Sequence, residues 1–165
     1  MSSPGPITDS VAQLQRLVAE STAFQTRIAS VDPAVIAAKI LSYDYLDDPV
    51  AIKELRPFAV VWPGENLTIS RYAGGSQSWL KVDRGDLILI LTDKDNFPND
   101  RSQSAADFVG WVDQVLMDII AGAGKDDRLT ISEISFKYPP ARNSVKDEQA
   151  AGAYYSVAFL VSWGQ

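Results

Sequence analysis

The chain has 165 residues, of which 46% are hydrophobic and 22% are charged, a balance typical of one globular domain and far from disordered compositions. Fifteen Lys and Arg against 21 Asp and Glu leave a net charge of -6, which argues against a surface that binds nucleic acid tightly. The sequence contains no Cys and no His, which excludes disulfides, Cys or His zinc ligands, and Ser-His-Asp or Cys-His catalytic pairs.

The N-terminus lacks the basic and apolar regions of a secretory signal, and no run of residues approaches the roughly 18 apolar residues of a membrane span. We therefore expect no membrane association and a protein made in the cytoplasm. No internal repeat or break in composition marks a second domain, so residues 1–165 should form a single domain, with residues 1–7 as a flexible leader.

Helical periodicity dominates the first part of the chain. A cap at Thr8, Asp9 or Ser10 should begin one amphipathic helix of about five turns, whose apolar stripe extends from Val11 to Ile28. Asp32-Pro33 has the residue types that begin a short second helix. The following residues 40–43 are compatible with either a helix or an edge strand.

An extended pattern begins near residue 56. Phe58–Trp62 reads as a strand closed by Pro63-Gly64, and Leu67–Tyr72 reads as its antiparallel partner across a hairpin turn. Trp79–Val82 is a candidate short strand. The apolar run Asp86–Thr92 predicts a central strand that is buried on both faces.

The second half of the chain predicts a helix and two strands. Ser104 resembles a helix cap, and the helix Ala105–Ala121 should be the main core helix, ending at Gly122–Gly124 with a left-handed cap. Leu129–Tyr138 predicts a strand whose apolar phase slips, and the two prolines that follow should end it. Tyr154–Trp163 alternates strictly and predicts the last strand.

Together these elements predict an α+β fold, with a mixed or mainly antiparallel sheet flanked by an N-terminal helix and a central amphipathic helix.

The most site-like cluster is Asp93-Lys94-Asp95, because two carboxylates at a strand end could share a hard cation. A solvated charged turn is the simpler interpretation, since no further oxygen ligands follow. Gly74-Gly75 lacks the residues of a phosphate loop, and Gly122–Gly124 ends a helix where a phosphate site would begin one. We therefore expect no catalytic residues, no metal and no cofactor.

Aromatic and charged residues outside the apolar stripes are candidates for subunit contacts. Trp62 follows a strand at a turn, Trp79 lies beside a Gly/Ser loop, and residues 141–152 form a long polar loop that could reach a neighbour. The predicted interface residues are Trp62, Tyr72, Trp79, Arg142, Lys146 and Asp147.

The order of elements resembles the tail terminator or tail completion family, small virion proteins at the head-tail junction of tailed bacteriophages. The resemblance rests on the helix Val11–Ile28, the strands Phe58–Trp62, Leu67–Tyr72 and Asp86–Thr92, the helix Ala105–Ala121 and the closing strand Tyr154–Trp163. It is one of pattern and order, because no short motif defines the family.

The resemblance implies a non-enzymatic virion subunit that assembles into a ring, commonly a hexamer. Such a ring contacts tail-tube and neck proteins and surrounds the DNA path without binding DNA specifically. Two other classes remain open: a small metal-dependent hydrolase that uses Asp93, Lys94 and Asp95, and a small-molecule binding module with an apolar pocket beside Trp62 or Trp79.

Overall fold

The computed structural model describes residues 5–42, 55–74, 77–125, 129–143 and 153–164. Its elements, in chain order, are α1 (Pro6–Ala19), α2 (Thr22–Ile28), α3 (Pro33–Ala38), β1 (Ile40–Leu41), β2 (Phe58–Gly74), β3 (Gln77–Lys94), α5 (Arg101–Ala123), β4 (Thr130–Asn143) and β5 (Tyr154–Gly164).

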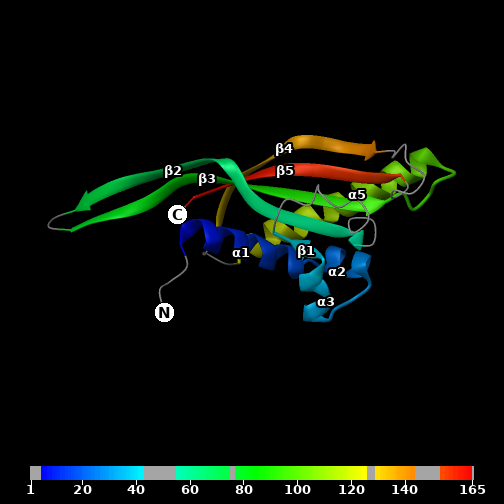
Figure 1. Cartoon of the computed structure of the whole chain (residues 1–165), viewed down its shortest axis with the longest axis horizontal. Coiled ribbons are helices and arrows are strands. Elements are labelled where there is room, and N and C mark those ends of the chain that lie inside the picture. Colours follow the sequence, from blue (N-terminus) through cyan, green and yellow to red (C-terminus); the bar gives the residue numbers. More distant parts are fainter. Residues whose placement is uncertain (1–4, 43–54, 75–76, 126–128, 144–152, 165) are drawn as a thin grey trace.

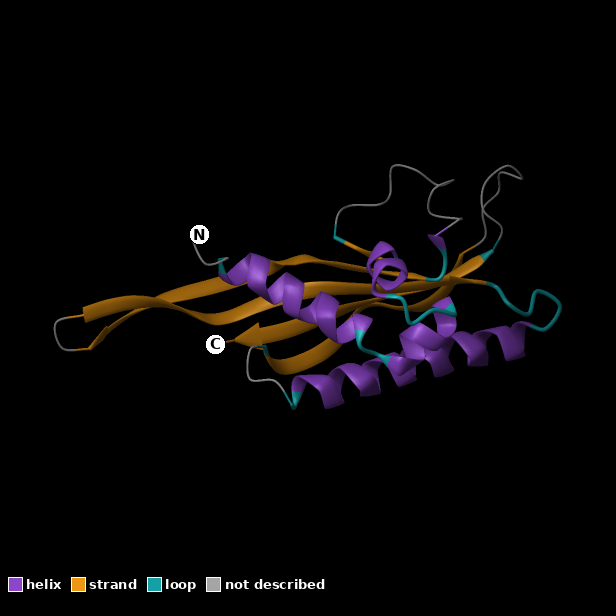
Figure 2. Ribbon diagram, turned by 90° about the horizontal axis from the view of Figure 1, so that it is seen from below, coloured by secondary structure: helices purple, strands orange, loops and turns teal. Residues whose placement is uncertain are grey.

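The strands form one sheet in the order β1-β2-β3-β5-β4. β1 runs parallel to β2, and the other neighbouring strands are antiparallel. Helices α1 and α5 lie on the same face of the sheet (Figures 1 and 2). The predicted α+β class with a mixed sheet is confirmed.

The N-terminal helix is broken where one continuous helix was predicted. Ser21 caps a second helix, because its hydroxyl accepts a hydrogen bond from the backbone N–H of Phe24. α1 also begins earlier than predicted, at Pro6 with Gly5 as its N-cap, so the end of the predicted leader is helical. The short helix capped by Asp32 is confirmed.

The predicted hairpin turn at Pro63-Gly64 is wrong, because both residues lie inside the long strand β2. Phe58 to Trp62 pair with the later part of β3, and the register shifts between Pro63 and Leu67. A Cβ on Gly64 would lie 2.9 Å from backbone and side-chain atoms of Asp86, so this glycine permits a close approach of two strands.

The main helix begins at Arg101, not at Ala105, and its cap is Asp100, which accepts a hydrogen bond from the backbone N–H of Gln103. Ser104 lies inside the helix. At the other end Gly124 has a φ of -66°, so the predicted left-handed cap is wrong. The helix instead ends with a backbone hydrogen bond from Gly124 to Ile120.

β4 is an irregular edge strand. Its pairing with β5 contains three register shifts, which confirms the predicted slip of the apolar phase. The two prolines do not end the strand, which continues to Asn143. An edge strand tolerates proline because its outer N–H groups need no strand partner.

β3 is the middle strand of the sheet, and one of its faces is fully buried. Leu87, Leu89 and Leu91 pack beneath the helices, whereas Ile88 and Ile90 on the opposite face are only partly buried, so the prediction of burial on both faces holds for one face. The core joins this strand to α1, α5 and β5 through residues that include Leu14, Val18, Phe108, Val115, Ile119, Val157, Phe159 and Val161.

β2 and β3 are longer than the helices beneath them. β2 has 17 residues and β3 has 18, which at about 3.3 Å per residue gives strands of about 55–60 Å. α1 with 14 residues and α5 with 23 extend only about 21 and 35 Å. The outer part of the hairpin therefore projects beyond the helices (Figure 1), and we call its residues 67–74 and 77–85 the arm.

The base of the arm generates a stability prediction. A Cβ on Gly85 would lie 2.7 Å from the buried ring of Trp163, so Gly85→Ala should lower the free energy of unfolding by about 1–3 kcal/mol. Gly110 in α5 has no atom within 4 Å of an added Cβ, and Gly110→Ala should raise stability by about 0.5–1 kcal/mol. Urea unfolding of both variants measures the contrast, and equal effects would contradict the close packing at Gly85.

Candidate functional site

Three of the predicted interface residues lie on the β2–β3 hairpin. The side chain of Trp62 is 46% exposed, on the face of the sheet opposite the helices. Tyr72 and Trp79 pair through their backbones near the tip of the arm, and their side chains lie outside the described part of the structure. The fold thus places all three on the projecting hairpin, a grouping that the sequence did not predict.

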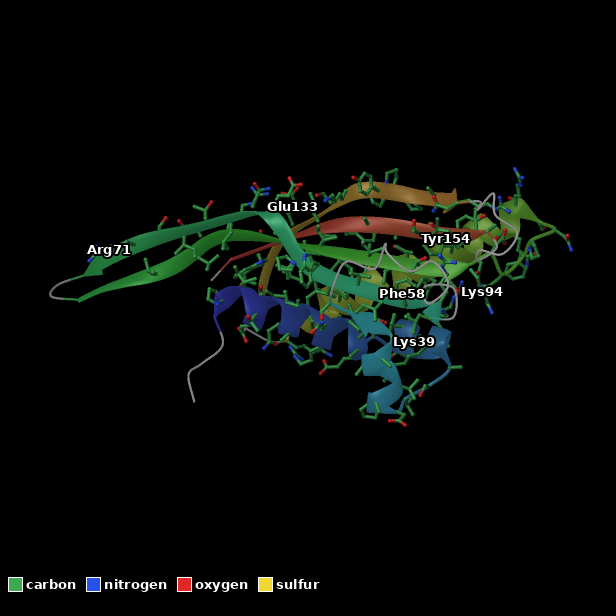
Figure 3. The ribbon with its side chains drawn as sticks, in the orientation of Figure 1. Lys39, Phe58, Arg71, Lys94, Glu133 and Tyr154 are labelled. Atoms are coloured by element: carbon green, nitrogen blue, oxygen red, sulfur yellow. The ribbon has the colours of Figure 1, made fainter. Side chains whose placement is uncertain are left out.

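The other three predicted residues belong to the end of β4 and the segment after it. Arg142 donates a hydrogen bond from Nε to Oδ2 of Asp95 at 3.1 Å, so part of its charge is used within the chain. Lys146 and Asp147 lie outside the described residues. The arm and Arg142 are at opposite ends of the molecule, as Arg71 and Tyr154 show in Figure 3.

The arm has one apolar and one polar face. Ile69 pairs with the buried Val82, which places it on the face that continues the core, and Leu67 and Leu80 share that face. The exposed fractions of Leu67, Ile69 and Leu80 are 40%, 44% and 71%. The opposite face is polar, with Ser70 donating a hydrogen bond to Asp83. The apolar face is therefore laid out like a core surface, yet it is exposed.

Sequence reasoning missed these apolar residues because it interpreted β2 and β3 as four short strands. A signal was available, since alternation resumes on both sides of the Gly-Gly turn, from Leu67 to Tyr72 and again from Trp79 to Val82. A single long hairpin accounts for both segments.

A second exposed apolar surface lies between the end of α5 and the start of β4. This hollow, which we call the α5–β4 slot, has a volume of about 570 Å³ and is lined by Ile120, Ala123, Gly124, Leu129, Thr130, Ile131, Ser132, Glu133 and Ile134. Ile120 is 54% exposed, and Phe136, farther along the same face of β4, is 58% exposed. α5 therefore leaves this edge of the sheet partly uncovered.

Another hollow, of about 640 Å³, lies between α2 and α5 and includes Arg27, Asp107 and Trp111. Neither hollow is lined by Trp62 or Trp79, the residues on which the binding-module hypothesis was based. That hypothesis gains no support from them.

Arg27 of α2 is the centre of an ion-pair cluster that joins three elements. Its Nε lies 2.6 Å from Oδ2 of Asp93 on β3, and its two terminal nitrogens lie 3.0 and 2.5 Å from the carboxylate of Asp107 on α5. The guanidinium also lies 5.3 Å from the ring centroid of Trp111. Burial opposes the charge of Arg27, but its hydrogen bond to Asp107 and the charge of Asp93 outweigh burial and raise its pKa.

Asp95 forms a second connection at the same end of the sheet. Its carboxylate accepts hydrogen bonds from the hydroxyl of Ser104 on α5 and from Arg142 on β4. The Ser104 hydroxyl, and then the Arg142 guanidinium, hold the pKa of Asp95 below its ordinary value. Only 3% of the Asp95 side chain is exposed.

These contacts bear on the metal-site hypothesis. Asp93 and Asp95 each face a guanidinium group, which supplies the positive charge that a cation would otherwise supply. Among the described residues, no group of three or more Asp, Glu, His or Cys is placed to hold a metal ion. The carboxylates instead connect α2, α5 and β4 to the end of β3.

No family model and no curated protein matches the chain. Among solved structures it is similar to a chain of the virion of a native gene transfer agent (GTA) particle, with 10% sequence identity and a TM-score of 0.33. The alignment covers 98% of this chain and 100% of that chain. At this TM-score the alignment does not define a common fold.

None of the helices in the described ranges is long and apolar enough to cross a membrane.

The ion-pair cluster predicts a pH-dependent contribution to stability. The hydrogen bond from Arg27 lowers the pKa of Asp107, so this carboxylate stabilises the fold above its unfolded pKa and loses that effect as pH falls through its folded pKa. Asp107→Asn should therefore cost on the order of 1 kcal/mol at pH 7, and the difference from wild type should shrink below about pH 4.

Urea unfolding from pH 7 to pH 3 measures this difference. Asp113→Asn, at an exposed position on the same helix, is the control. A difference for Asp107→Asn that is constant across the pH range would contradict a stabilising role of the charged carboxylate.

Proposed function

We propose that this chain is a structural virion protein of a tailed bacteriophage, which forms a ring at the tail end or the head-tail junction. The observation that carries the proposal is the arm, a projecting two-stranded hairpin whose apolar face is exposed at Leu67, Ile69 and Leu80. The order of the elements, which resembles the tail terminator family, supports the same assignment.

A projecting arm of this kind requires a partner. A two-stranded hairpin that packs against nothing is marginally stable in water, and large exposed apolar groups in a row mark surfaces that another protein covers. Because the arm extends away from the body of its own subunit, the contact joins one surface to a different surface of a neighbour (Figure 1). Such heterologous contacts close into a ring when the rotation between subunits permits it.

The proposed ring is a hexamer, the number that the family resemblance implies, and it contacts tail-tube and neck proteins in the virion. The net charge of -6 supports a passive role around DNA, because like charge disfavours adhesion of a polyanion to the channel. The proposed subunit acts through shape and contact, without catalysis.

The proposal predicts that a charge on the apolar face of the arm weakens assembly. Leu80→Lys should reduce the affinity between subunits about tenfold or more, because the lysine would have to be desolvated in the contact. The stability of the subunit should change by less than about 0.5 kcal/mol, since the Leu80 side chain is 71% exposed. Sedimentation velocity over a concentration series measures the affinity, and thermal unfolding measures the stability.

Val31→Lys is the matched control, because Val31 is an apolar side chain that is 80% exposed and lies outside the arm. It should leave assembly unchanged. A wild-type chain that remains monomeric at every concentration and is absent from phage particles would refute the proposed function.

A further inference from the structure

We propose that the apolar face of the arm of one subunit lies in the α5–β4 slot of the next subunit. This inference rests on the proposed ring and names the two surfaces that form its repeated contact.

The arm supplies a ridge that matches an apolar slot. Leu67, Ile69 and Leu80 lie on one face of a two-stranded ribbon, and their face is continuous with the core through Val82. Strands in a ribbon lie about 4.8 Å apart, so the arm is about as wide as a single helix. The arm can therefore cover the strip of sheet that a further helix would cover.

The slot lacks such a helix. α5 packs beneath β3 and β5, while Ile131 and Ile134 of β4 are only partly buried and Ile120 at the rim of the slot is 54% exposed. Phe136 stacks on Phe159 with ring centroids 5.3 Å apart and still leaves 58% of its own surface exposed. The uncovered strip thus continues from the slot along the helix side of β4.

The two surfaces cannot meet within one chain. β2 and β3 lead the arm away from the body, whereas the slot lies under the edge strand β4 (Figures 1 and 2). A contact between the arm and the slot therefore joins two copies head to tail. Arm-to-arm pairing would give a closed dimer and would leave every slot uncovered.

The irregularity of β4 indicates how the contact is made. Pro139, Pro140 and the three register shifts disfavour pairing of a neighbouring strand along its outer edge. Side-chain packing on the helix side of β4 is free of that obstacle. The arm should therefore bind through its apolar face, and not by adding a strand to the sheet.

The absence of cysteine from the sequence permits a direct test, because every introduced thiol is the only one in its chain. Ile69→Cys on the arm and Ile120→Cys at the slot are mixed in equal amounts at a concentration where subunits associate, and are then mildly oxidised. The expected product is a disulfide-linked heterodimer, and the double variant I69C/I120C should give a ladder of covalent oligomers. Leu80→Cys replaces Ile69→Cys if the latter does not fold.

The control pair combines Ile69→Cys with Val31→Cys, which should not cross-link. Predominant I69C homodimers, or equal cross-linking of the control pair, would overturn the arm-to-slot contact. If the wild-type chain forms rings but I69C and I120C do not cross-link, this inference fails and the proposed function stands. If the chain neither associates nor occurs in virions, both fail.

Discussion

The structure depends on a mismatch in length between its two layers. One face of the sheet is covered by α1 and α5, whose apolar side chains bury Leu87, Leu89 and Leu91 of the middle strand. Strands rise about 3.3 Å per residue and helices only about 1.5 Å, so helices of 14 and 23 residues cannot cover strands of 17 and 18 residues. The arm and the uncovered helix side of β4 both follow from this shortfall.

The opposite end of the molecule is held by charge. Arg27 connects α2 to β3 and α5 through Asp93 and Asp107, and Asp95 connects the end of β3 to α5 and β4. Paired and hydrogen-bonded charges of this kind are costly to separate, because removing one partner leaves the other desolvated without compensation. The carboxylates that most resembled an active site in the sequence therefore serve to fix elements in place.

A rigid body with a projecting arm suits a protein that works by contact. The side chains that drive chemistry near neutral pH without assistance are missing from the sequence, and the two strand-end carboxylates are already paired with arginine. What the described surface offers is apolar area in two places, on the arm and in the slot. Apolar area of this kind stabilises an assembly when another subunit covers it.

The sequence by itself determined the types of most elements, because these depend on local periodicity: the alternation from Tyr154 to Trp163 and the helical spacing from Phe108 to Ile119 persist in the fold. It also determined the excluded chemistry, because absent residue types cannot act. Only the tertiary structure decided that Pro63-Gly64 continues a strand, since Gly64 is required by its approach to Asp86, which is distant in sequence. The arm, the slot and the ion-pair cluster were likewise decided by tertiary structure, because each joins residues that no local pattern relates.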